Sequence, residues 1–384
     1  MARATDAPTD APTGAPGDAP ERRPPALPSW TTVLPPTAVV VLAAVWGRDL
    51  APLLVGAVAL VLAGAVLAAV HHAEVVAHRV GEPFGSLVLA VAVTVIEVAL
   101  IVTLVASGGP ETASLARDTF FAAVMITVNG IVGLSLFVAA RRHGLAVFNA
   151  EGAGAALATV ATLAALSLVL PTFTTSEPGP EFSPGQLAFA AVASLAVYGM
   201  FVVTQTVRHR DFFLPVHPDG SPLGADEHAE PPSRRTAGIS VGLLVLALVA
   251  VVGLAKVESP AIEAGVEAAG FPASFVGVVI ALLVLLPETL AAGRAASRGL
   301  TQTSLNLALG SAMASIGLTI PVIALASIWL EGPLVLGLEP TQLVLLALTV
   351  VVGVLTVVPG RATRLQGGIH LVLLAAFLFL AVNP

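Results

Sequence analysis

Long apolar segments, separated by short groups of Gly, Pro and charged residues, recur along this chain from about residue 31 to its C-terminus. Most are close to the roughly 20 residues that a helix needs to cross a bilayer. The pattern therefore predicts an all-α integral membrane protein. The eleven expected spanning helices lie at 31–46, 51–78, 84–107, 117–140, 150–170, 185–207, 236–257, 272–293, 303–330, 340–358 and 365–381.

Composition supports the membrane class and excludes others. The 384 residues are 56% hydrophobic and only 11% charged, whereas a soluble domain carries about 25% charged residues. The chain has no cysteine, which excludes disulfides and thiolate metal sites. Its 17 basic residues are scattered in ones and twos, so there is no nucleic-acid-binding patch.

The first 30 residues differ from the rest. They contain Asp-Ala-Pro-Thr twice, in 6–9 and 10–13, and continue in Ala, Pro and Gly. Such a segment cannot bury enough apolar surface to offset the entropy of ordering, so 1–30 is expected to be a disordered tail. It lacks the apolar core of a signal peptide, which leaves insertion to the first span.

The basic residues predict how the helices are oriented, because cytoplasmic loops of membrane proteins are enriched in Lys and Arg. With the N-terminus inside, the outer side keeps only Arg48, Arg117 and Lys256. The other fourteen fall on the inner side: Arg3, Arg22, Arg23, Arg79, Arg141, Arg142, Arg208, Arg210, Arg234, Arg235, Arg294, Arg298, Arg361 and Arg364. We therefore expect a cytoplasmic N-terminus and an external C-terminus.

The longest interior polar stretch, the linker 208–235, divides the remaining helices into two groups of five, in 51–207 and 236–381. Val88–Glu97 can be laid over Val279–Glu288 without a gap, and each glutamate then falls in the second helix of its group. Because five is odd, the second group must cross the membrane in the opposite sense to the first. Inverted repeats of this kind place a substrate site near the midplane.

The two aligned glutamates are the main candidates for function. Of 24 acidic residues, only Glu97 and Glu288 fall well inside the expected spans, and no basic residue accompanies them there. An ionised carboxylate at this depth costs at least a few kcal/mol unless it is compensated. The pair must therefore be protonated or must face a cation from solution, as proton-coupled cation exchange requires. The alternative is two neutral carboxylic acids hydrogen-bonded between helices.

Hydroxyl and amide side chains follow each glutamate in the next helix. Asn129 lies in the first repeat, and Ser311 and Ser315 share one helix face in the second. Their oxygens are hard ligands suited to Na⁺ or Ca²⁺, although small residues also serve close helix packing. Pro287 frees a backbone carbonyl about one turn earlier, at Leu283 or Val284, or simply kinks the helix.

Two groups of histidines remain. His71, His72, Glu74 and His78 lie at the inner end of the second expected helix, but their spacing does not match a His-Glu-x-x-His zinc motif. A polar helix end is the preferred interpretation, and an intramembrane metalloenzyme the alternative. The linker also holds His209, His217 and His228 among Asp219, Asp226, Glu227 and Glu230. It is interpreted as a solvated segment, and a cytoplasmic sensor of protons or calcium is the alternative.

Several strings resemble the bacterial calcium/proton antiporters of the ChaA type, which belong to the cation/calcium exchanger superfamily. The resemblance covers about 50–381 of this chain. The strings are HAEV at 72–75, GEPFG at 81–85, VTVIE at 93–97, RDT at 117–119, NGIVG at 129–133, QTVRHRD at 205–211, LPET at 286–289 and QTSLNLALGSAMASIGLTIP at 302–321.

The resemblance implies a peripheral first helix followed by two inverted five-helix repeats. It also implies that the glutamate of each repeat, here Glu97 and Glu288, binds Ca²⁺ and exchanges it for protons. The superfamily's carbonyl ligands fall on Val93 and Val284, and its site-lining hydroxyl and amide groups on the three polar residues named above. The Gly-Asn that commonly precedes the glutamate is replaced here, by Val93-Thr94 in the first repeat and Val284-Leu285 in the second. This departure leaves Na⁺ or K⁺ as further candidate ions.

The sequence thus predicts a secondary transporter, not an enzyme, which exports Ca²⁺ across the plasma membrane in exchange for protons by alternating access. No cofactor is expected beyond the transported ions, and the bilayer is the expected surrounding. A passive cation channel is the first alternative, and it would conduct without a pH gradient.

Overall fold

The computed structural model describes residues 29–48, 50–81, 84–107, 113–216, 232–329 and 333–384. The expected tail 1–30 lies almost wholly outside these residues. So does most of the linker, with His217 and His228 and the four acidic residues expected beside them.

Eleven helical segments fill the described part of the chain, in the order and nearly at the places that hydropathy predicts. Three of them are built from consecutive pieces that include a π-helical stretch. The elements are α1 (Trp30–Val45), α2 (Pro52–Val80), α3 (Phe84–Ser107), α4 (Leu115–Met125), η2 (Ile126–Ile131), α5 (Val132–His143), β1 (Ala146–Val147), α6 (Ala150–Ala164), η3 (Ala165–Val169), α7 (Leu170–Phe173), α8 (Pro184–Val203), η4 (Thr204–Arg208), η5 (Arg210–Phe213), α9 (Arg234–Ala268), α10 (Phe275–Ser297), α11 (Thr301–Ala326), α12 (Pro340–Val357), β2 (Arg361–Ala362) and α13 (Arg364–Val382).

The helices have the length and composition of membrane spans. Among the described residues, nine are long and apolar enough to cross a bilayer, and Trp30–Val45 and the Val91–Thr103 part of α3 are shorter apolar helices. The all-α membrane fold class is therefore confirmed. The two very short strands β1 and β2 pair antiparallel through Ala146 and Ala362, and join the loops that precede α6 and α13.

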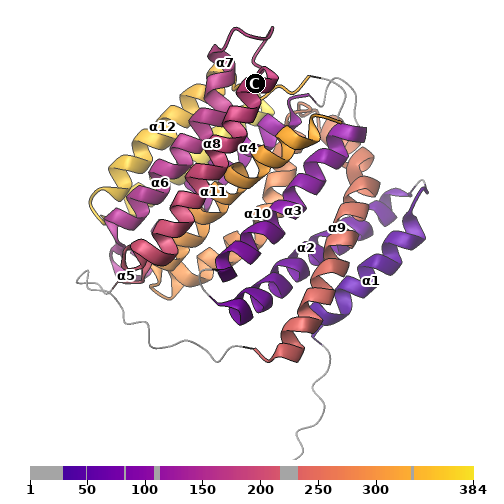
Figure 1. Ribbon diagram of the computed structural model, residues 1–384, viewed down its shortest axis with the longest axis horizontal. Coiled ribbons are helices and arrows are strands. Elements are labelled where there is room, and N and C mark those ends of the chain that lie inside the picture. Colours follow the sequence, from indigo (N-terminus) through magenta and orange to yellow (C-terminus); the bar gives the residue numbers. More distant parts are fainter. Residues whose placement is uncertain (1–28, 49, 82–83, 108–112, 217–231, 330–332) are drawn as a thin grey trace, which may run out of the picture.

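Figure 1 shows how the two repeats are arranged. The peripheral α1, with α2 and α9, lies along one side, and α6, α8 and α12 lie along the other. Between them stand α3, α10 and α11, which pack on one another. We call the end where α8 and η4 finish and α9 begins the linker side, and the opposite end, where α2 begins and α9 ends, the far side.

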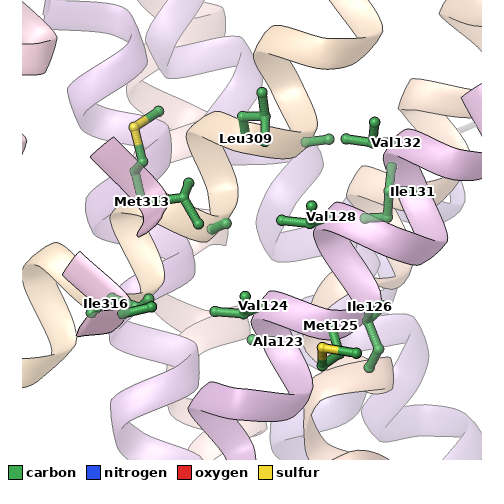
Figure 2. Packing of buried hydrophobic residues seen from close by; sticks show 14 of the residues in the cluster. Ala123, Val124, Met125, Ile126, Val128, Ile131, Val132, Leu309, Met313 and Ile316 are labelled. Atoms are coloured by element: carbon green, nitrogen blue, oxygen red, sulfur yellow. The ribbon is translucent and has the colours of Figure 1, made fainter. Parts of the chain in front are cut away.

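Two hydrophobic clusters hold the helices together. One joins α1, α2 and α9 to buried residues of α3 and α10. The other is centred on α4, η2 and α5, which pack against α11. Figure 2 shows Val124, Val128 and Val132, spaced four residues apart, pointing toward Leu309 and Ile316 across this second interface. The helix that follows each glutamate is thus packed against its counterpart from the other repeat.

Glycines allow the closest helix approaches. A Cβ at Gly367 of α13 would lie 2.6 Å from the backbone nitrogen of Phe137 in α5. A Cβ at Gly277 of α10 would lie 2.8 Å from the backbone nitrogen of Thr119 in α4. No side chain fits at either place, so small residues here serve packing, as they commonly do between membrane helices.

The sequence-based end of the seventh span is wrong. That span was expected to finish at 257, but α9 continues through Pro260 to Ala268. Glu258 therefore lies inside a helix with only 2% of its surface exposed. The expectation that only Glu97 and Glu288 are deep acids fails at this position, because an acid followed by Ser-Pro looks like a helix end.

Candidate cation site

Glu97 is held by hydroxyl groups from the other repeat. The carboxylate sits in the middle of α3 and is 3% exposed. Ser315 of α11 donates to Oε1 at 2.5 Å, and Thr319, one turn later, donates to Oε2 at 3.2 Å. Each hydroxyl keeps lone pairs with which it can coordinate a cation. The two repeats therefore share one group of oxygens.

Glu288 is buried but differently placed. Its side chain, in α10, is 6% exposed, and its Oε2 has no hydrogen-bond partner among the described residues. It lines a cavity of ≈ 130 Å³, together with residues of α3, α8 and α11. Gln205 and Asn306, near the linker-side ends of α8 and α11, also line this cavity. Glu288 therefore lines a space that extends toward the linker side, while its buried Oε2 has no donor among the described residues.

The two glutamates line neighbouring cavities that share lining residues. Glu97 lines a second, smaller cavity of ≈ 10 Å³, and Val93 and Ser311 line both cavities. A space of this size holds about one water-sized body. The structure thus places Glu97, Glu288, Val93 and Ser311 around two neighbouring cavities.

Two further candidates lie at this site. Ser315 lines the smaller cavity and bonds Glu97, and Val284 lines the same cavity from α10. Pro287 stands inside α10. Because proline has no N–H, the carbonyl of Leu283 lacks its usual helical partner. The helix continues through the proline, and the carbonyl oxygen about one turn before Glu288 is free of a helical hydrogen bond.

Asn129 is placed elsewhere. It lies in the π-helical stretch η2 and is fully buried, but its side chain points to α12 and α13. Its amide nitrogen donates to Thr349 Oγ1 at 2.8 Å, and its Oδ1 is 3.0 Å from His370 Nδ1. His370 Nε2 in turn is 3.2 Å from Thr356 Oγ1. In this conformation Asn129 belongs to a polar network beside the site, and no hydrogen bond joins it to either glutamate within the described residues.

Two threonines belong to the site although the sequence-based argument passed over them. Thr319 bonds Glu97, and Thr119 lines the smaller cavity. A signal for Thr319 was present, because Ser311, Ser315 and Thr319 follow one another at four-residue steps. Thr119 has no comparable signal, since its place depends on how α4 packs against α10.

The histidines at the linker-side end of α2 do not form a metal site. Nowhere in the described ranges do three His, Cys, Asp or Glu side chains come together in a way that could hold a metal ion. His72 is buried, with Nε2 2.9 Å from the carbonyl oxygen of Thr31 and Nδ1 3.3 Å from Ser240 Oγ. This histidine ties α2 to α1 and α9. The polar-helix-end interpretation fits these contacts, and the metalloenzyme alternative does not.

The arrangement defines a membrane transporter built from two repeats around paired glutamates, and comparison with known proteins agrees. Residues 50–207 and 239–383 match the family described as sodium/calcium exchanger protein. A Sinorhizobium fredii protein described as an ionic transporter, y4hA, is 48% identical over 84% of this chain and 87% of its own length. The Escherichia coli sodium-potassium/proton antiporter ChaA is 33% identical over 91% of this chain and 95% of its own.

Solved structures share the fold. The structure of native YfkE aligns with a TM-score of 0.68 at 15% identity and covers 92% of this chain and all of that one. The H⁺/Ca²⁺ exchanger CAX aligns with a TM-score of 0.67 at 17% identity and covers 91% of this chain and 86% of that one. The chain belongs to the sodium/calcium exchanger family. It is a multi-pass membrane antiporter, and its family exchanges cations such as Ca²⁺, Na⁺, K⁺ and H⁺.

Proposed function

We propose that this antiporter exchanges Ca²⁺ for protons by alternating access, with Glu97 and Glu288 as the groups that bind both. Val93 and Val284 supply backbone oxygen, and Ser311 and Ser315 supply hydroxyl oxygen. Asn129, which bonds Thr349 and His370 here, reaches the ion only if η2 turns during the transport cycle. No resident cofactor takes part, because the chemistry lies in the two carboxylates and in the ions themselves.

The observation that carries the proposal is the pairing of two buried carboxylates without a cationic side chain beside them. Glu97 has two hydroxyl donors, and Glu288 lines a cavity and has one oxygen without a donor among the described residues. One divalent cation or two protons leave the pair with the same net charge. A bare pair of carboxylates would be costly at this depth. The site is therefore stable when it is loaded with either ion, which is the condition for exchange.

The preference for Ca²⁺ follows from charge and from ligand type. Two carboxylates with several hydroxyl and carbonyl oxygens suit a hard divalent ion. The names of the relatives indicate different ions. The E. coli relative is named a sodium-potassium/proton antiporter, and a 22% identical protein of Aphanothece halophytica is named a Ca²⁺/H⁺ antiporter. Na⁺ and K⁺ are therefore the competing ions.

Access in this conformation is from the linker side. The larger cavity reaches Glu288 between α8 and α11, whereas Glu97 lies behind Val93 and Ser311. The distribution of basic residues supports a cytoplasmic linker side, and the proposed location is the plasma membrane. We infer an inward-facing state, in which Ca²⁺ from the cytoplasm meets Glu288 first and Glu97 second.

An ion-flux panel in everted membrane vesicles tests the proposal. A pH gradient is imposed, and Ca²⁺, Na⁺ and K⁺ are added separately while internal pH is followed with a fluorescent probe. Ca²⁺ is expected to release protons from the vesicles at micromolar to millimolar concentration, and monovalent ions to do so less effectively. Absence of proton movement with all three ions would overturn cation/proton exchange.

A second measurement separates exchange from passive conduction. With the pH gradient collapsed and a Ca²⁺ gradient imposed, an exchanger must move protons in the direction opposite to Ca²⁺ and so create a new pH gradient. A channel lets Ca²⁺ move with no accompanying proton flux. Uptake of radioactive Ca²⁺ down its gradient without any change of internal pH would favour the channel.

A further inference from the structure

Besides Glu97 and Glu288, another acidic residue lies buried in a membrane helix without a basic partner among the described residues, away from the site described above. Glu258 of α9 is 2% exposed, and its Oε1 is buried without a hydrogen-bond partner in the described part of the chain. An ionisable group at such a position is a candidate for function by default, because burial without a purpose is costly. The exchange proposed for Glu97 and Glu288 makes no use of it.

Glu258 continues the packed face of α9. Ala247, Val251 and Leu254 precede it at steps of three or four residues and belong to the cluster that joins α9 to α2, α3 and α10. Ser240, near the start of α9, meets His72 of α2 at the linker side. Glu258 is 18 residues further along, or about 27 Å at 1.5 Å per residue. It therefore lies in the interface of α9 at the far side.

No cation balances this carboxylate within the described residues. Lys256 lies over the Trp46 ring, with its Nζ 5.6 Å from the ring centroid. The next acid, Glu263, is exposed and accepts a hydrogen bond from Ser259 at 3.2 Å. The helix α1, the far-side half of α2, the part of α3 that follows Glu97 and the part of α10 before Glu288 contain no Asp, Glu, His, Lys or Arg. Nothing placed against Glu258 from these helices can neutralise its charge.

We propose that Glu258 is a third proton-binding site of the protein and that its proton locks the far side closed. It carries a proton while α9 is packed, and loses that proton to water when the far side opens. The inference depends on the proposed function only in assuming that the far side opens at all. A higher pH on the far side should therefore favour the open state, independently of which cation is bound.

The chain contains no cysteine, so a single introduced thiol reports on this opening without background. Ser259→Cys is nearly isosteric, and Ser259 is 1% exposed next to Glu258. A membrane-impermeant maleimide is given to everted and to right-side-out vesicles at about pH 6 to about pH 9, which covers much of the range in which glutamates titrate in proteins. No transported cation is added, so the result is readable even if the ion panel fails.

At each pH, the labelling rate of Ser259→Cys is divided by the labelling rate of the double variant that also carries Glu258→Gln. This ratio removes the pH dependence of the thiol's own reactivity. We expect this ratio to rise at least about fivefold over the range, from the vesicle side that exposes the far side. Glu258→Asp keeps a titratable group and should retain the rise. Glu267→Gln, the same change at an exposed position of α9, should behave like the parent.

Three results would overturn the inference. The ratio stays flat with pH, or no labelling occurs from either side at any pH. A third contrary result is a lower thermal midpoint for Glu258→Gln than for the parent. An amide mimics a protonated glutamate in shape and charge, so the variant should unfold no earlier than the parent.

Discussion

At the scale of single residues, the two glutamates differ in how strongly the protein holds them. Glu97 is fixed by two hydroxyl donors from α11, whereas Glu288 has a free oxygen beside a cavity. A fixed carboxylate provides a preorganised ligand, and a free one can turn to meet an incoming ion. The difference suits a site that is entered from the side of Glu288.

Replacing either glutamate by glutamine removes the titratable charge and keeps the shape of the side chain. Because no Lys or Arg accompanies the pair, neither Glu97→Gln nor Glu288→Gln leaves a cation stranded, and the fold should survive. Ca²⁺-dependent proton movement should vanish in each variant, since one carboxylate cannot balance a divalent ion in a site of low dielectric constant. Flux in everted vesicles measures this.

Glu267→Gln is the matched control, because Glu267 is exposed on α9; it should transport at the parent rate. Aspartate at either position withdraws the carboxylate by about one methylene and should transport poorly. Near-normal Ca²⁺/proton exchange in either glutamine variant would place the coupling site elsewhere.

The hydroxyls that bind Glu97 should set the affinity for the cation. Ser315→Ala removes the shorter bond, of 2.5 Å, and Thr319→Val the longer one, of 3.2 Å. A hydrogen bond to a charged group contributes about 1.5–3 kcal/mol, so the Ca²⁺ concentration for half-maximal flux should rise about tenfold or more. The effect should be larger for Ser315→Ala.

Thr159→Val is the control for the threonine change, because Thr159 Oγ1 donates only to the carbonyl oxygen of Ala155 within α6. Its half-maximal Ca²⁺ concentration should match that of the parent. If Thr319→Val and Thr159→Val behave alike, Thr319 plays no part in binding the ion.

At the scale of elements, the segment from α4 through η2 to α5 combines two tasks. One face packs against α11 (Figure 2), and another presents Asn129 to α12 and α13. A π-helical stretch shifts the register of the side chains on either side of it, and such stretches are frequent at functional sites. The shift explains how a residue that aligns with site-lining groups can point away from the glutamates.

Asn129→Ala should therefore act on stability more than on ion affinity in this conformation. The change removes one buried partner each from Thr349 Oγ1 and His370 Nδ1, at a cost of about 1–3 kcal/mol for each unsatisfied group. The midpoint of thermal unfolding in detergent, followed by tryptophan fluorescence, should fall by several degrees, about 5 °C or more. Asn383→Ala, at the exposed C-terminus, should leave it unchanged.

The Ca²⁺ affinity of Asn129→Ala decides whether Asn129 binds the ion or only packs against α12 and α13. If the half-maximal Ca²⁺ concentration of Asn129→Ala rises as much as that of Ser315→Ala, then η2 turns during transport and Asn129 reaches the ion. If it stays within about twofold of the parent, the residue is a packing group. Ser311→Ala, whose side chain lines both cavities, provides the comparison.

The histidines of α2 offer a test of the discarded metal site. Replacing His71, His72 and His78 together by Gln should leave Ca²⁺-dependent flux largely intact, since no three-ligand cluster exists among the described side chains. Some loss of thermal stability is expected, because His72 bonds Thr31 and Ser240. Complete loss of flux in a well-folded triple variant would restore the metal-site interpretation.

The sequence could predict the site only where chemistry and periodicity coincide. Glu97, Glu288, Ser311 and Ser315 combine a polar side chain with a deep position in an apolar helix, so the sequence alone could single them out. Glu258 could not be predicted as a buried acid, because Pro260 looks like the end of a helix in the sequence. Only packing shows that α9 continues. The orientation of Asn129 depends on the π-helical register, which has no sequence signal.

At the scale of the whole molecule, the number of spans explains the fold. Eleven hydropathy maxima correspond to eleven helical segments, and the odd number in each repeat makes the repeats inverted. The packing of α4 against α11 and the pairing of β1 with β2 join the halves. Neither contact could be predicted from the sequence, since each links segments that are far apart in the chain.

The direction in which the molecule sits in the membrane is the last prediction. Helix ends at the linker side carry Arg79, Arg142, Arg208, Arg234 and Arg294, whereas the far side has few basic residues. The positive-inside rule predicts a cytoplasmic linker side. A phosphatase or fluorescent-protein reporter fused after Asp226 should therefore report the cytoplasm, and one fused after Pro384 the exterior.

The two fusions test the span count as well as the direction. Between Asp226 and Pro384 the chain holds five helical segments, α9 to α13, so the reporters must lie on opposite sides. If the fusion after Asp226 reports the exterior and the one after Pro384 the cytoplasm, the orientation is wrong and the fold stands. If both report the same side, one of the five helices does not cross. The second repeat then is not the inverted counterpart of the first, and Glu288 loses its equivalence with Glu97.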